Sequence, residues 1–289
     1  MNYDSIYKAD LFAGQNIIVT GGGSGIGRCT AHELAALGAK VIITGRKQDK
    51  LDAVAAEIAE DGGVCASASF DIRDEDAVRD AVKAIIAEHG EIHALVNNAG
   101  GQYPAPLMAI SKKGWDAVVA NNLTGGFLVA REVFNQSMKK TGGAIVNMLA
   151  DMWGGMPGMG HSGAARMGML SFTETAAVEW AFAGVRVNAV APGWIASSGL
   201  DTYDENFIKD VIPQMKGGVP LQRLGTEAEI SSCIVFLLSP GASFVSGQCI
   251  AIDGAASRNT KLFPLLDQQR SKPYDGFHRA VTPEAVKNL

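Results

Sequence analysis

Residues 20–27 read Thr-Gly-Gly-Gly-Ser-Gly-Ile-Gly, and this stretch decides the fold. The apolar run 17–19 (Ile-Ile-Val) precedes it, and a segment with helical spacing of apolar residues follows it. Gly21, Gly25 and Gly27 allow a sharp turn and a close approach of phosphate to the backbone, and the following helix directs its free N–H groups at the negative charge. This order of strand, turn and helix predicts a dinucleotide site near the start of the chain.

The glycine spacing differs from the usual dinucleotide fingerprint. Gly-x-Gly-x-x-Gly counted from Gly21 requires a third glycine at position 26, where the chain has Ile26. The pattern Thr-Gly-x-x-x-Gly-x-Gly fits instead. An ordinary glycine-rich loop is the alternative, and the flanking strand and helix disfavour it.

The composition points to small-molecule chemistry. The chain has 289 residues, of which 47% are hydrophobic, so it is long enough to bury a substantial core. Its net charge of -5 provides no general attraction to nucleic acid or to an anionic membrane. The four cysteines have no Cys-x-x-Cys spacing, and they therefore suggest neither a metal site nor a disulfide framework.

The sequence contains no apolar run of about 18 residues, the length that a membrane helix needs. Its first residues include Asp4, Lys8 and Asp10 rather than a signal-peptide core. The tripeptide 287–289 (Lys-Asn-Leu) is a poor match to a peroxisomal address. We expect a cytoplasmic protein with no nucleic-acid partner and no membrane partner.

Strand-like and helix-like segments alternate along the chain, which predicts βαβ units and a parallel sheet. The expected strands are 17–19, 40–44, 64–70, 94–96, 144–149, 186–191 and 249–252, and the expected helices are 28–37, 50–59, 74–88, 115–139, 163–180 and 227–238. The fold class is α/β, a single Rossmann-type doubly wound domain with seven parallel strands. We expect this domain over 1–256, with a substrate lid at 197–224. The tail 257–289 is polar and patternless, and is either an arm or disordered.

The end of the second strand indicates the cofactor. A fold of this kind that selects NAD places a carboxylate there, whereas this chain has Arg46 and Lys47. Two cations suit the 2′-phosphate of NADP(H), because Arg can hold a phosphate with two hydrogen bonds and Lys adds a point charge. A solvated turn is the alternative. Asp71 follows the third strand, where it either accepts a hydrogen bond from the adenine amino group or caps the next helix.

Five motifs together resemble the short-chain dehydrogenase/reductases over residues 11–256. They are Thr20-Gly21-x-x-x-Gly25-x-Gly27, Asn97-Asn98-Ala99-Gly100, Asn122 within Asn-Leu-Thr-Gly, Pro192-Gly193 and Asp253-Gly254. The resemblance implies a nicotinamide cofactor and a homodimer or homotetramer. The cofactor-binding residues that follow from the motifs and the resemblance are Thr20, Gly21, Gly23, Ser24, Gly25, Ile26, Gly27, Arg46, Lys47, Asp71, Ile72, Asn98, Ala99, Gly100, Arg166, Pro192, Gly193 and Ile195.

The catalytic tetrad of that family is Asn, Ser, Tyr and Lys, and this chain keeps only the first, Asn122. In the register set by Phe172-Thr173 and Glu179-Trp180, Arg166 stands at the lysine and Ser162 at the tyrosine. The serine position falls on Leu149 or Ala150.

This loss affects one reaction more than another. Reduction of a carbonyl leaves an alkoxide that must be protonated, which suits a phenol whose pKa of about 10 is lowered by a neighbouring cation. Ser162 is too weak an acid and too short. Reduction of a double bond conjugated to a thioester leaves an enolate, which needs hydrogen-bond donors more than a strong acid. Asn122 and the cofactor ribose hydroxyl are candidate donors.

A closer resemblance agrees with that reaction. The runs 161–166 (His-Ser-Gly-Ala-Ala-Arg), 98–102 (Asn-Ala-Gly-Gly-Gln) and 113–115 (Lys-Gly-Trp) are similar to the peroxisomal trans-2-enoyl-CoA reductases. The tyrosine-free helix entry is similar to the 2,4-dienoyl-CoA reductases. This implies NADPH-dependent reduction of an enoyl thioester in fatty acid metabolism. Relatives can carry a proton-donating Asp or Tyr four residues after the basic position, where this chain has Leu170, so the resemblance assigns no proton donor.

The candidate catalytic residues are Asn122, Ser162, Arg166 and Asp151. Asp151 follows the fifth strand at the end where such sheets bind ligands, and it donates a proton, orients a water or is a solvated loop carboxylate. His161 points about 100° away from Ser162 on a helix, which favours a structural role. Arg166 lies one turn after Ser162 and anchors the cofactor without relaying protons.

The expected pocket is apolar. Its candidate wall residues are Met148, Met152, Trp153, Met156, Met159 and Trp194, although core packing explains any one of them. An acyl-CoA-like substrate fits such a wall. Two other functions remain open: an alcohol or aldehyde dehydrogenase, on terpenoid substrates for example, that uses Asp151 or His161 as the acid, and a catalytically silent NADP(H)-binding protein.

Overall fold

A sheet of seven parallel strands forms the centre of the computed structural model, which describes residues 2–203, 207–260 and 262–287. The strands are β1 (Asn16–Thr20), β2 (Lys40–Gly45), β3 (Val64–Ser69), β4 (Ala94–Asn97), β5 (Gly143–Met148), β6 (Val185–Pro192) and β7 (Cys249–Ile252). Their order across the sheet is β3-β2-β1-β4-β5-β6-β7. Successive strands are added on one side of β1 up to β3 and on its other side from β4 onward. Ligands of such folds bind at this switch point, beyond the carboxyl ends of the strands. The expected α/β fold class is confirmed.

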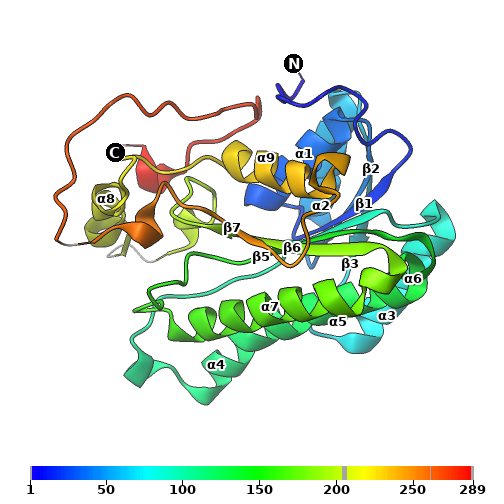
Figure 1. The fold of residues 1–289 in the computed structure, drawn as a ribbon, viewed down its shortest axis with the longest axis horizontal. Helices are drawn as coiled ribbons and strands as arrows, with labels where there is room; N and C mark the ends of the chain where they lie inside the picture. The colour runs from blue at the N-terminus through cyan, green and yellow to red at the C-terminus, as the bar shows by residue number, and fades with distance from the viewer. Residues whose placement is uncertain (1, 204–206, 261, 288–289) are drawn as a thin grey trace.

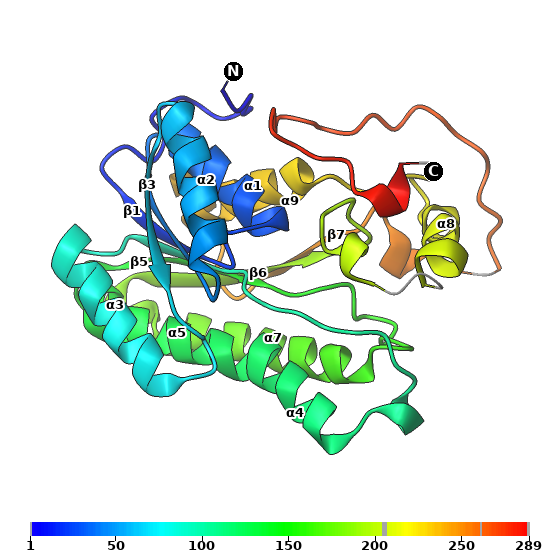
Figure 2. The same ribbon diagram turned by 180° about the vertical axis from the view of Figure 1, so that it is seen from behind.

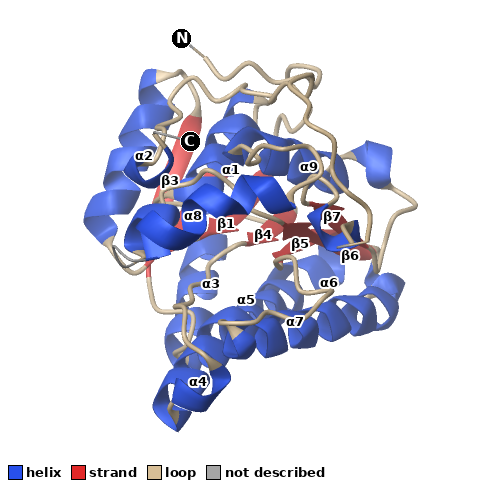
Figure 3. Ribbon diagram, turned by 90° about the vertical axis from the view of Figure 1, so that its left-hand side faces the viewer, coloured by secondary structure: helices blue, strands red, loops and turns tan. Residues whose placement is uncertain are grey.

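Helices cover both faces of this sheet (Figures 1 and 3). The helices of the described residues are α1 (Gly25–Ala36), α2 (Gln48–Glu60), α3 (Glu75–His89), α4 (Lys112–Val119), α5 (Gly125–Val133), α6 (Lys139–Thr141), α7 (Gly160–Glu179), α8 (Ile212–Met215) and α9 (Glu227–Leu238). One layer holds α1, α2 and α9, and the other holds α3, α5 and α7. Figure 2 shows the same two layers from behind.

Buried side chains alternate between the two faces of the strands. In β1, Ile17 and Val19 pack with the α1, α2 and α9 layer, while Ile18 packs with the α3, α5 and α7 layer. All three are at most 1% exposed. A parallel sheet covered on both faces requires apolar residues at consecutive positions, which is why these strands read as continuous apolar runs.

The helix expected at 115–139 is a longer helical run with two wide turns. It extends from Lys112 to Thr141 and contains π-helical segments at Ala120–Thr124 and Phe134–Met138. It begins earlier than the apolar pattern suggests because the Ser111 side chain accepts a hydrogen bond from the Gly114 N–H and caps the first turn. The first π segment contains Asn122, and wide turns of this kind often occur at functional sites.

The described part of the tail, 257–260 and 262–287, forms an arm. It runs from β7 to the N-terminal segment and then returns toward α8 (Figure 1). The Asp4 N–H donates to the Gly276 carbonyl, and Phe277 is 2% exposed beside Tyr3. Arg279 donates to both carboxylate oxygens of Asp61. Of the two alternatives for the tail, the structure shows an arm.

The segment expected as a lid, 197–224, contains short helical turns and α8. Its residues 204–206 lie outside the described residues, as do the last two residues of the C-terminal tripeptide. Leu200, Ile212 and Met215 form a small apolar cluster, and Ala285 and Val286 of the arm pack against it. Within the described residues, no helix is both long and apolar enough to cross a membrane.

Candidate active site

The glycine turn connects β1 to α1 and is held against β4. Gly21 and Gly25 have φ angles of +68° and +57°, which residues with a side chain rarely adopt. A Cβ on Gly27 would lie 2.4 Å from the Gly21 carbonyl oxygen, so only glycine allows the helix to approach the turn. Thr20 does not line the groove. Its Oγ1 accepts hydrogen bonds from the N–H groups of Asn98 and Ala99, at 3.0 and 2.9 Å, and joins the ends of β1 and β4.

A long groove runs along the carboxyl ends of the strands. It consists of two cavities of about 310 and 470 Å³ that share Gly21, Ser24, Ala99 and Gly100. Apart from Thr20, every residue expected to bind the cofactor lines one of them: Gly21, Gly23, Ser24, Gly25, Ile26, Gly27, Arg46, Lys47, Asp71, Ile72, Asn98, Ala99, Gly100, Arg166, Pro192, Gly193 and Ile195. Ser198 and Asn121 also line the groove, and the motifs did not indicate them.

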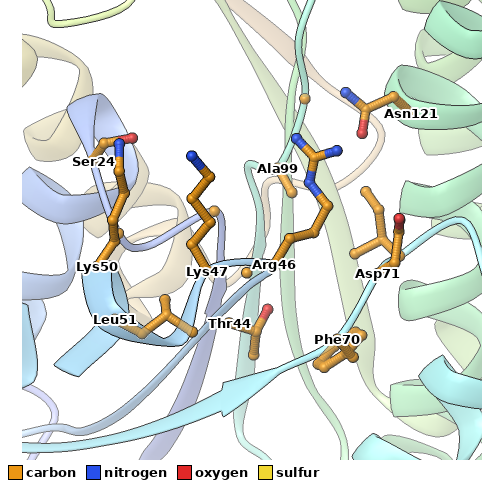
Figure 4. Close-up of a pocket in the computed structure, with 15 residues that line it drawn as sticks. Ser24, Thr44, Arg46, Lys47, Lys50, Leu51, Phe70, Asp71, Ala99 and Asn121 are labelled. Atoms are coloured by element: carbon orange, nitrogen blue, oxygen red, sulfur yellow. The ribbon is translucent and has the colours of Figure 1, made fainter.

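Three cations stand at one end of the groove. Arg46, Lys47 and Lys50 extend their charged ends in a common direction (Figure 4). Sequence reasoning missed Lys50, although it follows Arg46 by four residues and lies in the first turn of α2. None of the three forms an ion pair with another described residue, so all three are available to an anionic group.

Asp71 lines the same end and is bound by Arg73. The Arg73 side chain donates to both carboxylate oxygens, and these hydrogen bonds lower the pKa of Asp71 to about 2. Asp74, and not Asp71, caps α3, because its carboxylate accepts a hydrogen bond from the Ala77 N–H. The capping alternative for Asp71 is therefore wrong.

At the other end of the groove, Asn122 and Arg166 converge on Gly100. A Cβ on Gly100 would lie 2.8 Å from Asn122 Oδ1 and 2.8 Å from Arg166 Nη2. Asn122 Oδ1 accepts a hydrogen bond from the Gly101 N–H at 2.8 Å, and its Nδ2 donates to the Gly101 carbonyl at 3.0 Å. Arg166 Nη1 donates to the Met148 carbonyl at 2.6 Å. Burial lowers the pKa of Arg166 to about 10, which leaves the guanidinium charged at neutral pH.

Ser162 lies behind this end of the groove and does not line it. Its side chain is fully buried, and its Oγ donates to Gln102 Oε1 at 2.5 Å. Ala150 and Leu149, at the serine position of the family, line the groove without a hydroxyl. The family's serine and tyrosine positions therefore present neither a hydroxyl nor a phenol to the groove.

A second chamber of about 200 Å³ opens from the groove. Its lining residues are Gln102, Ala150, Asp151, Gly155, Met156, Pro157, Met159, Pro192, Gly193 and Trp194. We call it the methionine chamber. Of the other expected wall residues, Met148 lines the groove, Met152 is buried in a core cluster, and Trp153 is 38% exposed outside both cavities.

Asp151 is the carboxylate of the methionine chamber. Its N–H donates to the Pro192 carbonyl, which holds it at the carboxyl ends of β5 and β6. Burial, with the charge of Asp253 as a smaller cause, raises the pKa of Asp151. His161 lines neither cavity. It is fully buried, with its ring edge-on to that of Tyr103 at 4.7 Å between centroids.

Comparison with known proteins agrees with this fold. Residues 21–256 match the family model described as enoyl-(acyl carrier protein) reductase. The chain belongs to the short-chain dehydrogenase/reductase family and is an oxidoreductase that binds a nicotinamide cofactor. It is 38% identical over 242 residues to a probable 2,4-dienoyl-CoA reductase of Bacillus subtilis, covering 82% of this chain and 94% of the relative.

Two solved structures are similar along most of their length. The citronellol catabolism dehydrogenase AtuB of Pseudomonas aeruginosa PAO1 has 64% sequence identity and a TM-score of 0.80, with 88% of this chain and 100% of that chain covered. A chain from Beutenbergia cavernae that contains NADP at low occupancy has 30% identity and a TM-score of 0.81, with 87% and 100% covered.

Proposed function

We propose that this protein is an NADP(H)-dependent reductase of an α,β-unsaturated acyl thioester. The observation that carries the proposal is Ser162, which is fully buried and bonded to Gln102 at the position of the family's phenol. Reduction of a conjugated double bond needs hydrogen-bond donors at the thioester oxygen rather than a strong acid there. Met156, Met159 and Trp194 of the methionine chamber offer apolar surface to an acyl chain.

The residues of the groove fit NADP(H). Arg46, Lys47 and Lys50 offer three unpaired cations to the 2′-phosphate, and the glycine turn leaves space for a pyrophosphate at the N-terminus of α1. When bound, the cofactor supplies a hydride. Arg166 stays charged and holds the nicotinamide end, and it relays no proton.

We assign two further residues to the reaction. The Asn122 amide bonds to Gly101 through its Oδ1 and through one N–H of its Nδ2, and we propose that it positions the loop beside the nicotinamide end. Asp151 is a carboxyl group in the methionine chamber with a raised pKa, and we propose that it delivers the proton to the α-carbon, directly or through water.

A second candidate rests on the 64% identity to a citronellol catabolism dehydrogenase. In that case the chamber takes a branched terpenoid chain, and the reacting group is an alcohol or aldehyde. The two candidates share the cofactor and the methionine chamber, and they differ in the acid that they require.

We also propose that the protein is a cytoplasmic homodimer or homotetramer, with its domain over 1–256 and a substrate lid at 197–224. Light scattering of the purified protein tests the state of assembly.

Steady-state assays that follow the oxidation of NADPH or the reduction of NADP⁺ separate the candidate functions. Purified protein is tested with NADPH on a medium-chain trans-2-enoyl-CoA, a 2,4-dienoyl-CoA and citronellal, and with NADP⁺ on citronellol. We expect turnover on a thioester. Turnover on citronellol or citronellal alone would overturn the first candidate, and cofactor binding without any turnover would favour a silent NADP(H)-binding protein.

A further inference from the structure

Gln102 lies where the cofactor groove meets the methionine chamber. Five residues line both the larger cavity of the groove and the methionine chamber: Gln102, Ala150, Pro192, Gly193 and Trp194. A thioester that extends its acyl chain into the chamber must place its reacting carbons at this junction. Only Gln102 and Trp194 of the five have a side-chain hydrogen-bond donor.

Ser162 determines which end of the Gln102 amide faces the groove. The Ser162 hydroxyl donates to Oε1 at 2.5 Å, and Ser162 is fully buried, so water does not compete for this bond. Because an amide has its oxygen on one side and its NH₂ on the other, Nε2 is held on the opposite side. Nε2 donates a hydrogen bond through one of its two N–H groups to the hydroxyl of Tyr203 at 3.5 Å, and Tyr203 lines the groove.

The backbone next to Gln102 is fixed as well. Asn122 makes two hydrogen bonds to the N–H and carbonyl of Gly101, at 2.8 and 3.0 Å. Ser162 on α7 and Asn122 on the π segment thus hold the loop and the amide from two elements. A donor held in this way does not need to reorganise when charge develops on a substrate, and this is the property that stabilises an oxyanion.

We propose that Gln102 Nε2 donates the hydrogen bond that holds the thioester carbonyl oxygen, and that Ser162 is the residue that positions it. This inference rests on the proposed function. Hydride adds to the β-carbon, the electrons of the double bond move to make an enolate, and the Gln102 N–H stabilises the oxygen without giving up its proton. The enolate returns to a carbonyl as a proton bonds to the α-carbon. An amide cannot protonate an alkoxide, so this donor favours alkene over carbonyl reduction.

The first test is a set of four variants, assayed with enoyl-CoA and NADPH. We expect Gln102→Leu to lower kcat by roughly 100-fold, as loss of one oxyanion donor does, with NADPH affinity unchanged. Ser162→Ala should lower kcat less, and Ser162→Thr, which retains the hydroxyl, should recover most of it. The double variant Gln102→Leu/Ser162→Ala should be no slower than Gln102→Leu, because Ser162 acts through Gln102.

Gln136→Leu is the matched control, since Gln136 lies on the second π segment and bonds to Arg79 and Glu132, away from the groove. Additive losses in the double variant, or an unchanged kcat in Gln102→Leu, would overturn the assignment.

The second test measures binding rather than turnover. Calorimetry with octanoyl-CoA in the presence of NADP⁺ should show weaker binding to Gln102→Leu than to the unmodified protein, by about 10-fold, a typical value for a lost hydrogen bond. If the unmodified protein binds octanoyl-CoA in this Gln102-dependent way and reduces no enoyl-CoA, the proposed function fails and the assignment of Gln102 stands. If it reduces enoyl-CoA and Gln102→Leu does so equally, the assignment fails alone. If it neither binds octanoyl-CoA nor reduces an enoyl-CoA, both fail.

Discussion

At the scale of single residues, Arg166 and Ser162 depart from the family tetrad, and the side chain of each forms a hydrogen bond within the site. Arg166 occupies the lysine position, and its guanidinium reaches both the Met148 carbonyl and the space beside Gly100. Ser162 occupies the tyrosine position, but it turns away from the groove to Gln102. A cation thus stands at the lysine position, and a buried hydroxyl bonded to an amide stands at the tyrosine position.

Arg46 provides a test of cofactor selectivity. We expect Arg46→Ala to weaken NADPH binding by roughly 10- to 100-fold, because a charge-assisted hydrogen bond contributes about 1.5–3 kcal/mol. NADH lacks the 2′-phosphate, so its affinity should change little. Fluorescence titration with both cofactors measures this, with Lys139→Ala, an exposed residue at the start of α6, as the control. Equal losses for the two cofactors would contradict the assignment of Arg46 to the phosphate.

At the scale of elements, the glycine turn and the arm each depend on a close contact. The first turn of α1 approaches the backbone of the glycine turn so closely that no side chain fits at Gly27. The arm is held at the other side of α1 by Phe277, whose ring stacks on Tyr3 and lies 4.9 Å from the Arg28 guanidinium. The first contact places the start of α1 in the wall of the groove, and the second holds the arm to the far side of the helix.

Substitution of Gly27 tests the first contact. Gly27→Ala places a Cβ against the Gly21 carbonyl oxygen, and overpacking of this kind costs about 1–3 kcal/mol. We expect a lower free energy of unfolding and weaker NADPH binding, measured by urea denaturation and by fluorescence titration. Gly154→Ala is the matched control, because no atom lies within 4 Å of a Cβ at that position. If Gly27→Ala has the stability and the NADPH affinity of the wild type, the backbone of the turn can move to accommodate the Cβ.

Substitution of Phe277 tests the arm. Phe277→Ala removes a ring that is 2% exposed, a change that costs about 3–5 kcal/mol in a well-packed site. We expect the arm to detach, so that limited proteolysis cleaves it faster while NADPH binding is unchanged. Phe263→Ala, in the same arm but 67% exposed, should be cleaved at the wild-type rate. Equal cleavage of the two variants would mean that Phe277 does not hold the arm.

At the scale of the whole molecule, carboxylates with shifted pKa values set the response to pH. Hydrogen bonds from Arg279 lower the pKa of Asp61 from 3.8 to about 2, and those from Arg73 do the same for Asp71. A carboxylate whose pKa is lowered in the folded state stabilises the fold at a pH above 3.8, and this stabilisation is lost as the pH falls toward 2. Burial raises the pKa of Glu227 from 4.5 to about 7, which acts in the opposite sense and over a separate window.

A pH series of thermal denaturation tests the low-pH window. We expect Tm to fall between about pH 4 and pH 2, because the unfolded chain binds protons that Asp61 and Asp71 exclude in the folded state. The variant Asp61→Asn/Asp71→Asn should have a lower Tm at pH 5 and a shallower fall below pH 4. The same slope in variant and wild type would assign the acid sensitivity to other groups.

Much of the fold followed from local patterns. Apolar runs and helical spacing placed all seven strands, and the runs are clearest in central strands such as β1, which are buried on both faces. Boundaries were less accurate where a cap or wide turn decides them, as at Ser111 and in the π segment around Asn122. The arm was left open, since Phe277 is an isolated aromatic residue whose partners are Tyr3 and Arg28.

By itself, the sequence determined the positions of the strands, the glycine turn and the cations Arg46 and Lys47, because these depend on residues close together in the chain. Only the tertiary structure decided which way Ser162 points and that Gln102 meets it from 60 positions away. The physical reason is that a hydrogen bond depends on distance and direction in space. Residues on separate elements acquire both only when the sheet and its helices have packed.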